Sequence, residues 1–159
     1  MSTRRQMTRF SFAVLTAVAA AAITGCDMLP PQMQPAPDAN LLTFTTQLRA
    51  SNEVPPNASP ASGSVDAVFN KDTSQLRWKV SFTGLSGPAT AAHFHGPAAV
   101  GANAGVVLPW PQPITSPMEG RATLTSAQAA DLLAGRWYAN IHTAAHPGGE
   151  VRGQMTLRN

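Results

Sequence analysis

The chain has one cysteine, Cys26, among its 159 residues, and charged residues make up only 12% of the sequence. A single cysteine excludes an intrachain disulfide. The formal net charge is +3, and no stripe of Lys and Arg with interleaved aromatic residues occurs, so nucleic acid is not an expected partner. The sequence also lacks a Gly-X-Ser-X-Gly motif, and no other nucleophile stands beside a recognisable base. Hydrolase catalysis is therefore not expected.

The first 25 residues have the three-part form of a secretory signal peptide. Arg4, Arg5 and Arg9 make a positive beginning, and residues 10–23 form an uncharged, alanine-rich apolar run. A run this short, followed by small residues, is typical of a cleaved signal and not of a membrane-spanning helix. We therefore predict that residues 1–25 do not belong to the folded domain.

The end of this run, Ile-Thr-Gly-Cys at residues 23–26, resembles the bacterial lipobox, in which the cysteine is acylated and becomes the first residue of the mature protein. The resemblance implies a lipid anchor on Cys26 and a place in the cell envelope, facing the periplasm or the exterior. Acyl chains such as palmitate add about 0.8 kcal/mol of membrane affinity per buried methylene, so two or three chains hold a domain at a bilayer. The alternative is ordinary signal cleavage that leaves Cys26 as a free thiol.

A proline-rich segment follows, from Cys26 to residue 40. Proline fixes φ and removes a backbone donor, so this segment is expected to form an extended tether instead of a helix or strand. The alternative, that it packs against the domain, is less favoured because the segment holds few large apolar groups. The folded domain is then expected to span residues 41–159.

Residues 76–82 carry the clearest secondary-structure pattern of the chain. Apolar side chains occupy every second position: Leu76, Trp78, Val80 and Phe82. This alternation indicates a β-strand with one buried face. Further strands are predicted at residues 41–48, 64–70, 90–95, 105–108, 136–143 and 150–157, with a brief pairing at 121–124.

One helix is predicted, with Ser126 as its capping residue and residues 127–133 as good helix formers. Gly135 suits the position just after the helix. Many short strands at near-regular spacing together with one helix indicate an all-β fold, an antiparallel β-sandwich with one short helix.

The last two strands are predicted to form a hairpin around Pro147, Gly148 and Gly149. Pairing apolar residues with apolar residues favours one register, or one displaced by two residues. The favoured register joins Tyr138 with Gln154, Asn140 with Arg152, and His142 with Glu150.

All four histidines lie in two short stretches of the sequence. His93 and His95 flank Phe94, and strand alternation directs Phe94 to the core and the two histidines outward. Gly96 and Pro97 then end the strand. Residues at positions i and i+2 of a strand lie about 6.6 Å apart at Cα, so their imidazoles can converge on one ion.

His142, on the outward face of the last hairpin, is the natural third ligand, and His146 or Glu150 could complete the set. Imidazole nitrogens without thiolates suit copper(II) or zinc(II). The alternative is structural, since histidines at strand ends often donate a ring N–H to a carbonyl and hold a loop. Glu150 and Arg152 could likewise form a structural pair, and both interpretations stay open.

Three segments of the chain resemble the CHRD domain, a repeat first described in the developmental regulator chordin and common in bacterial secreted proteins. They are residues 92–98 (AHFHGPA), 135–143 (GRWYANIHT) and 147–154 (PGGEVRGQ). Order and spacing agree from about residue 42 to residue 157. Ala139 stands where a larger aliphatic residue is usual, and His146 stands where asparagine is common, so the resemblance does not support His146 as a ligand.

This resemblance implies an immunoglobulin-like sandwich, distantly similar to copper/zinc superoxide dismutase, and a family without an agreed enzyme activity. The dismutase fold uses a strand His-X-His for copper, which directs attention to His93 and His95. The chain lacks the disulfide cysteines of that enzyme, and the loop after Gly96 carries no zinc ligands. Superoxide dismutation is therefore not expected.

The preferred interpretation is a cell-envelope lipoprotein whose domain acts as a non-catalytic binding or structural module, attached to the membrane and able to contact an envelope protein. The alternative is a copper- or zinc-binding protein that uses a surface cluster of His93, His95 and His142. A copper oxidoreductase is the least favoured, because it requires an open coordination position on the metal.

Overall fold

The computed structural model describes residues 39–158. The predicted signal peptide, Cys26 and the tether as far as residue 38 lie outside the described residues. The elements in chain order are β1 (Leu41–Arg49), a 3-10 turn η1 (Ala50–Asn52), β2 (Ser62–Asn70), β3 (Gln75–Thr83), β4 (Ala89–His95), β5 (Val106–Pro109), β6 (Met118–Thr123), α1 (Ser126–Leu133), β7 (Tyr138–Thr143), β8 (Val151–Gln154) and β9 (Thr156–Leu157).

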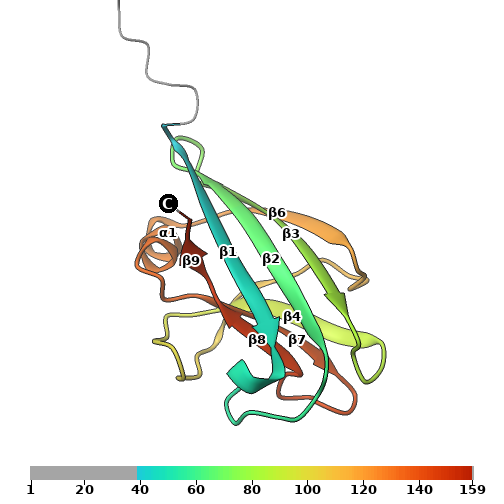
Figure 1. The fold of residues 1–159 in the computed structure, drawn as a ribbon. Helices are drawn as coiled ribbons and strands as arrows, with labels where there is room; N and C mark the ends of the chain where they lie inside the picture. Colours follow the sequence, from blue (N-terminus) through green and yellow to red (C-terminus); the bar gives the residue numbers. More distant parts are fainter. Residues whose placement is uncertain (1–38, 159) are drawn as a thin grey trace, which may run out of the picture. The chain divides into compact units, whose positions relative to one another are not determined.

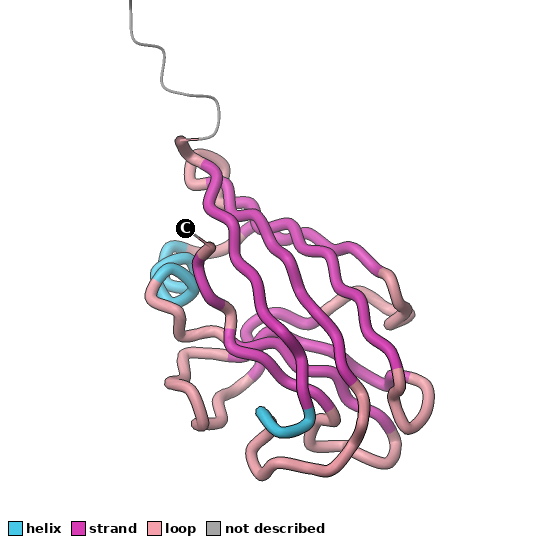
Figure 2. Tube along the Cα trace, viewed as in Figure 1, coloured by secondary structure: helices cyan, strands magenta, loops and turns pink. Residues whose placement is uncertain are grey.

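The strands form one antiparallel sheet in the order β5-β4-β7-β8-β1-β2-β3-β6, and β9 pairs with β1. The sheet curls so that β1, β2, β3 and β6 form one layer and β4, β5, β7 and β8 the other (Figure 1). Figure 2 shows the two groups of strands facing each other, with loops at both ends. The predicted all-β sandwich with one short helix is confirmed for the described residues.

The core lies between the two layers and is built from the alternation seen in the sequence. In β3, Leu76 and Val80 are fully buried and Trp78 is 4% exposed. Trp78 meets Phe94 of the opposite layer edge-on, with ring centroids 5.3 Å apart, and Phe94 lies 5.7 Å from Trp137. Aromatic contacts of this kind add to the apolar area that holds the layers together.

The helix α1 begins one residue earlier than a cap at Ser126 would place it, because Thr125 is the capping residue. Thr125 Oγ1 accepts from the Gln128 backbone N–H at 3.2 Å, and Gln128 Oε1 accepts from the Thr125 N–H at 2.9 Å. This reciprocal capping box satisfies two free donors at the helix start. Gly135 has a φ of +67°, as expected for its position after the helix. Among residues 39–158, no helix has the length and apolar character needed to cross a bilayer.

Two strand boundaries differ from the prediction because partners distant in the sequence decide them. The segment predicted as one strand at residues 150–157 breaks at Met155, whose backbone N–H donates to the Trp137 carbonyl at 2.8 Å. The chain then leaves β7 and pairs with β1 as β9. The strand β6 begins at Met118, earlier than residue 121, because Met118 pairs with Val80 of β3.

The predicted register of the last hairpin is confirmed over the paired residues of β7 and β8. Tyr138 pairs with Gln154 and Asn140 with Arg152, and the ladder ends where Ile141 meets Val151. Every side chain of β7 and β8 therefore lies on the face that alternation assigns to it.

The polar face of the β4–β7–β8 layer is covered by loops, contrary to the prediction that it faces solvent. His95 is 8% exposed, Arg152 2% and Glu150 0%. Asn57, from the loop after η1, donates to the Glu150 carbonyl at 3.0 Å, and Arg152 donates to Asn103, from the loop after β4, at 2.8 Å. The prediction of a surface cluster is therefore wrong for His95, which is buried and contacts Ala104 of the loop after β4.

Candidate metal centre

The structure brings His93, His95 and His142 together on the polar face of β4 and β7. One ring nitrogen of each lies within 4.8 Å of the other two. The strand pairing explains this arrangement, because β4 carries two of the histidines on one face and β7 runs antiparallel beside it. His93 and His142 are half-buried, so the site lies between the loop-covered face and solvent.

Backbone carbonyls orient two of the three rings. His95 Nδ1 lies 3.0 Å from the Ala104 carbonyl, and His142 Nδ1 lies 3.0 Å from the Pro147 carbonyl. A carbonyl can only accept, so both Nδ1 atoms donate, and in a neutral ring the Nε2 atom then carries a lone pair. His142 Nε2 lies 3.2 Å from His93 Nδ1, and His95 Nε2 is buried without a hydrogen-bond partner in the described residues.

The pKa values of His93 and His142 are lowered below the ordinary 6.5, mainly by burial. The neighbouring imidazoles lower them further, while the Pro147 carbonyl raises the pKa of His142 in part. Both rings are therefore neutral at pH 7. Neutral imidazole is the form that binds a metal ion.

The three ring nitrogens must close toward one another to bind a transition-metal ion. Donors of one tetrahedral ion, each about 2.0–2.1 Å from it, lie about 3.4 Å apart. The separations within the site reach 4.8 Å, so the widest pair must close by about 1.4 Å. A set of three imidazoles without thiolate suits copper or zinc, and the buried free nitrogen of His95 shows that the residues fit such an ion.

Glu150 is used elsewhere in the structure. Its carboxylate accepts from Ser59 Oγ at 2.6 Å, from Thr143 Oγ1 at 2.6 Å, and from Ser86 N and Oγ at 2.8 and 2.7 Å. Burial raises the pKa of Glu150, but these hydrogen bonds outweigh it and lower the pKa to about 2. Glu150 thereby joins two loops to the end of β7. His146 lies in the turn before β8 and does not join the three converging rings.

Residues that the sequence analysis did not single out surround the three histidines. The His95 ring stacks on Tyr138 with centroids 4.8 Å apart, and the Arg152 guanidinium carbon lies 3.4 Å from the Tyr138 ring centroid. Strand alternation places Tyr138, Asn140 and Arg152 on the same face as His142. The sequence therefore already indicated that these residues lie near the histidines.

A buried carboxyl, Glu53, lies behind Asn140. It is 6% exposed, and burial raises its pKa to about 7 against the opposing charge of Arg152. The Asn140 amide lies close enough to lower this pKa in part, although Glu53 Oε1 has no partner at full hydrogen-bond geometry. Gly149, with a φ of +129°, leaves room for both groups, since a Cβ there would overlap Glu53 Oε1 and approach Asn140 Nδ2 to 2.9 Å.

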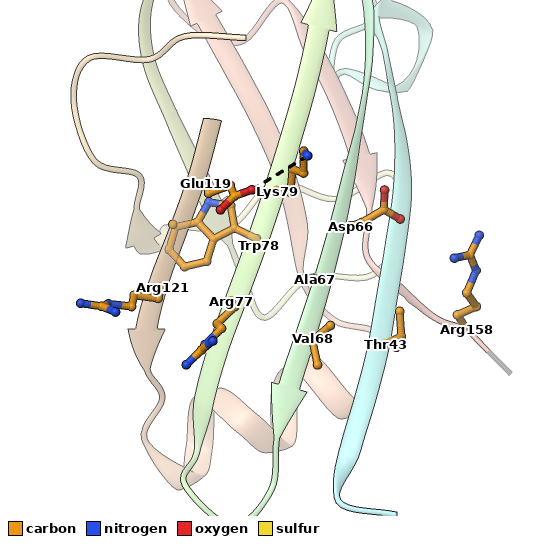
Figure 3. Close-up of a pocket in the computed structure, with 11 residues that line it drawn as sticks. Thr43, Asp66, Ala67, Val68, Arg77, Trp78, Lys79, Glu119, Arg121 and Arg158 are labelled. Atoms are coloured by element: carbon orange, nitrogen blue, oxygen red, sulfur yellow. Dashed lines mark ion pairs between the residues drawn. The ribbon is translucent and has the colours of Figure 1, made fainter. Parts of the chain in front are cut away.

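A second hollow lies on the outer face of the other layer and has a volume of about 560 Å³ (Figure 3). The strands β3 and β6 border it at Trp78 and Gly120, the Trp78 ring itself packs in the core, and charged side chains surround the hollow. Those charges are Asp66, Arg77, Lys79, Glu119, Arg121 and Arg158. The sequence analysis did not predict this groove, because it depends on the pairing of β3 with β6. It has no converging buried donors comparable to the three imidazoles.

A family model described as the CHRD domain matches residues 44–155. The match covers β1 to β8 and includes all three converging histidines. No curated protein and no solved structure matches the chain.

Proposed function

This chain belongs to the CHRD domain family, and we propose that it is a metal-binding module of the cell envelope that holds a copper or zinc ion at His93, His95 and His142. The observation that carries the proposal is the convergence of three ring nitrogens within 4.8 Å. A purely structural role explains the hydrogen bonds of Nδ1 in His95 and His142. It does not explain why Nε2 of His95 is buried without a partner beside two other imidazoles.

The orphaned nitrogen of His95 gives the strongest support for an ion over a structural role. A buried polar atom without a partner costs about 1–3 kcal/mol. Five side-chain atoms in the described residues are in this state, and His95 Nε2 is the one imidazole nitrogen among them. His95 Nε2 is buried and unpartnered, while its Nδ1 is held by the Ala104 carbonyl. A ligating histidine whose other nitrogen donates to a carbonyl is the usual arrangement at protein metal sites.

The proposal assigns the chain's own residues to binding and orientation. The two carbonyls orient the rings of His95 and His142, burial lowers the pKa of His93 and His142, and the loop after β4 limits the access of water to His95. A bound copper or zinc ion would supply Lewis acidity, and copper would also supply one-electron chemistry. The lipid anchor expected at Cys26 would hold this site at the membrane surface.

A titration of the purified chain with Cu(II) and with Zn(II) tests the proposal. The chain carries Cys26→Ser, so that its lone thiol cannot bind metal. We expect one ion per chain for the parent and for a His146→Ala control, and loss of that ion in a His93→Ala/His95→Ala variant. Equal, weak uptake by all three proteins would show that the histidines have a structural role.

A second candidate function is a metal-independent binding module, which the groove over Trp78 favours. The groove carries charged side chains of both signs, a composition that suits a polar protein or peptide surface. One comparison distinguishes the two functions. A partner that binds equally well after the His93→Ala/His95→Ala change, and that is lost when Arg77 and Arg121 are reversed to Glu, identifies the groove as the functional surface.

A further inference from the structure

We infer that Asn140 supplies the fourth donor of the metal centre through its side-chain oxygen, and that Glu53 holds the Asn140 amide in the required orientation. This inference rests on the proposed function of the three histidines. It gives the site three nitrogen donors and one oxygen donor, all from β4 and β7.

Asn140 has the position that a fourth ligand needs. It lies on β7 two residues before His142, on the same face, and it pairs directly with His93 of β4. Directly opposed residues have Cβ atoms about 4.5–5.5 Å apart, so one ion can lie between them. Asn140 is only 3% exposed, and its Oδ1 lies 2.9 Å from His142 Nε2.

Both nitrogens of the His142 ring face oxygens that can only accept: Nδ1 lies 3.0 Å from the Pro147 carbonyl and Nε2 lies 2.9 Å from Asn140 Oδ1. A neutral ring carries a single N–H, so one of these two contacts joins two acceptors. A cation held between Nε2 and Oδ1 would remove that repulsion. Donors of one tetrahedral ion lie about 3.4 Å apart, close to the observed 2.9 Å and to the 3.2 Å between His142 Nε2 and His93 Nδ1.

Glu53 explains why the oxygen of the amide, and not its NH2 group, faces the histidines. The Asn140 Nδ2 atom and Glu53 Oε1 both border the space left by Gly149. A carboxylate attracts the NH2 group, which leaves Oδ1 directed at the ring nitrogens. An outer-shell carboxylate that orients a ligand is a common feature of metal sites.

An amide oxygen is a harder donor than imidazole, and harder donors favour divalent ions over Cu(I). The four-donor set therefore selects Cu(II) or Zn(II). Removal of the oxygen is expected to weaken binding of the divalent ion by about 10–100-fold, the range seen for losses around metal ligands. Affinity for Cu(I) should fall less than affinity for Cu(II).

The test compares Asn140→Leu with Asn140→Asp in the full chain carrying Cys26→Ser. Leucine keeps the approximate size of asparagine without a donor, and aspartate keeps an oxygen in the same place. The measurements are Zn(II) and Cu(II) affinity, the electronic absorption spectrum with Co(II) as the probe ion, and thermal unfolding as a check on the fold. We expect a loss of affinity and a changed Co(II) spectrum for leucine, and an affinity at or above that of the parent for aspartate.

A measurement on the parent protein tests the inference without requiring that any variant folds. In the parent labelled with 15N, the Asn140 side-chain NH2 resonance should shift when Zn(II) is added, while the side-chain amide of Asn103 should not. An unmoved Asn140 resonance, or an Asn140→Leu protein with parental affinity and Co(II) spectrum, overturns this inference and leaves the three-histidine site intact. A parent that binds no ion ends the proposed function itself.

Discussion

The imidazole of His95 lies flat on the ring of Tyr138, with centroids 4.8 Å apart and planes within 2° of parallel. The Tyr138 hydroxyl accepts from the Ala104 N–H at 3.2 Å, next to the carbonyl that accepts from His95 Nδ1 at 3.0 Å. Tyr138 therefore fixes both the plane of the His95 ring and the loop that holds its Nδ1. Arg152 contacts the Tyr138 ring as well, so a fixed positive charge lies one ring away from His95.

The stacking of His95 on Tyr138 predicts that metal binding depends more on the Tyr138 ring than on its hydroxyl. We expect Tyr138→Leu to weaken Zn(II) binding by about 10–100-fold, because His95 loses the surface that orients it. Tyr138→Phe keeps that surface and should weaken binding by less than about tenfold. Isothermal titration of both variants measures the difference, and equal losses in the two would show that the hydroxyl, through Ala104, carries the effect.

The second prediction concerns stability at acid pH. The pKa of Glu150 falls from 4.5 to about 2 on folding, so its ionised form stabilises the native state above pH 4.5. That stabilisation amounts to about 3 kcal/mol for a shift of this size, and it disappears as the pH falls through about 2. The free energy of unfolding of the parent should therefore drop across this window.

In Glu150→Gln the contribution of the carboxylate is absent. The variant should be less stable than the parent at neutral pH, and the gap should narrow below pH 4.5 and close near pH 2. Glu119→Gln, at a carboxyl with a side chain 75% exposed, is the matched control and should follow the parent. Urea unfolding at several pH values gives the comparison, and a gap that stays constant with pH would contradict the account.

A third prediction tests the packing under the groove of Figure 3. A Cβ at Gly120 would overlap the Trp78 ring, so Gly120→Ala must displace a buried aromatic side chain. We expect it to destabilise the protein by about 1–3 kcal/mol. Gly87→Ala is the control, since an added Cβ at Gly87 meets nothing within 4 Å and should leave the melting temperature nearly unchanged.

The fourth prediction concerns the anchor. In cells given labelled palmitate, the parent should acquire label and sediment with membranes, because acyl chains on Cys26 bind the bilayer. Cys26→Ser should lose both the label and the sedimentation. An unlabelled parent released in soluble form would instead support ordinary signal cleavage.

The fold could be predicted from the sequence wherever local pattern and final pairing agree. Strict alternation identified β3, and the matching of apolar faces identified the register of β7 with β8. The break at Met155 was missed because it depends on the Trp137 carbonyl, which is distant in the sequence.

The candidate site was predicted in part. Parity placed His93, His95 and His142 on one face of the sheet, and the structure shows that they converge. The burial of His95 and the approach of Glu53 to Asn140 were not predictable, since both depend on the path of long loops. Loop paths follow from tertiary contacts such as Arg152 with Asn103, which carry no periodic signal.

The most direct test of the metal centre is anomalous diffraction from crystals of the chain grown with Zn(II) or Cu(II). We predict one strong peak that lies about 2.0–2.1 Å from a ring nitrogen of each of His93, His95 and His142. The account is contradicted if those three rings surround no peak, or if the ion binds at His146 instead.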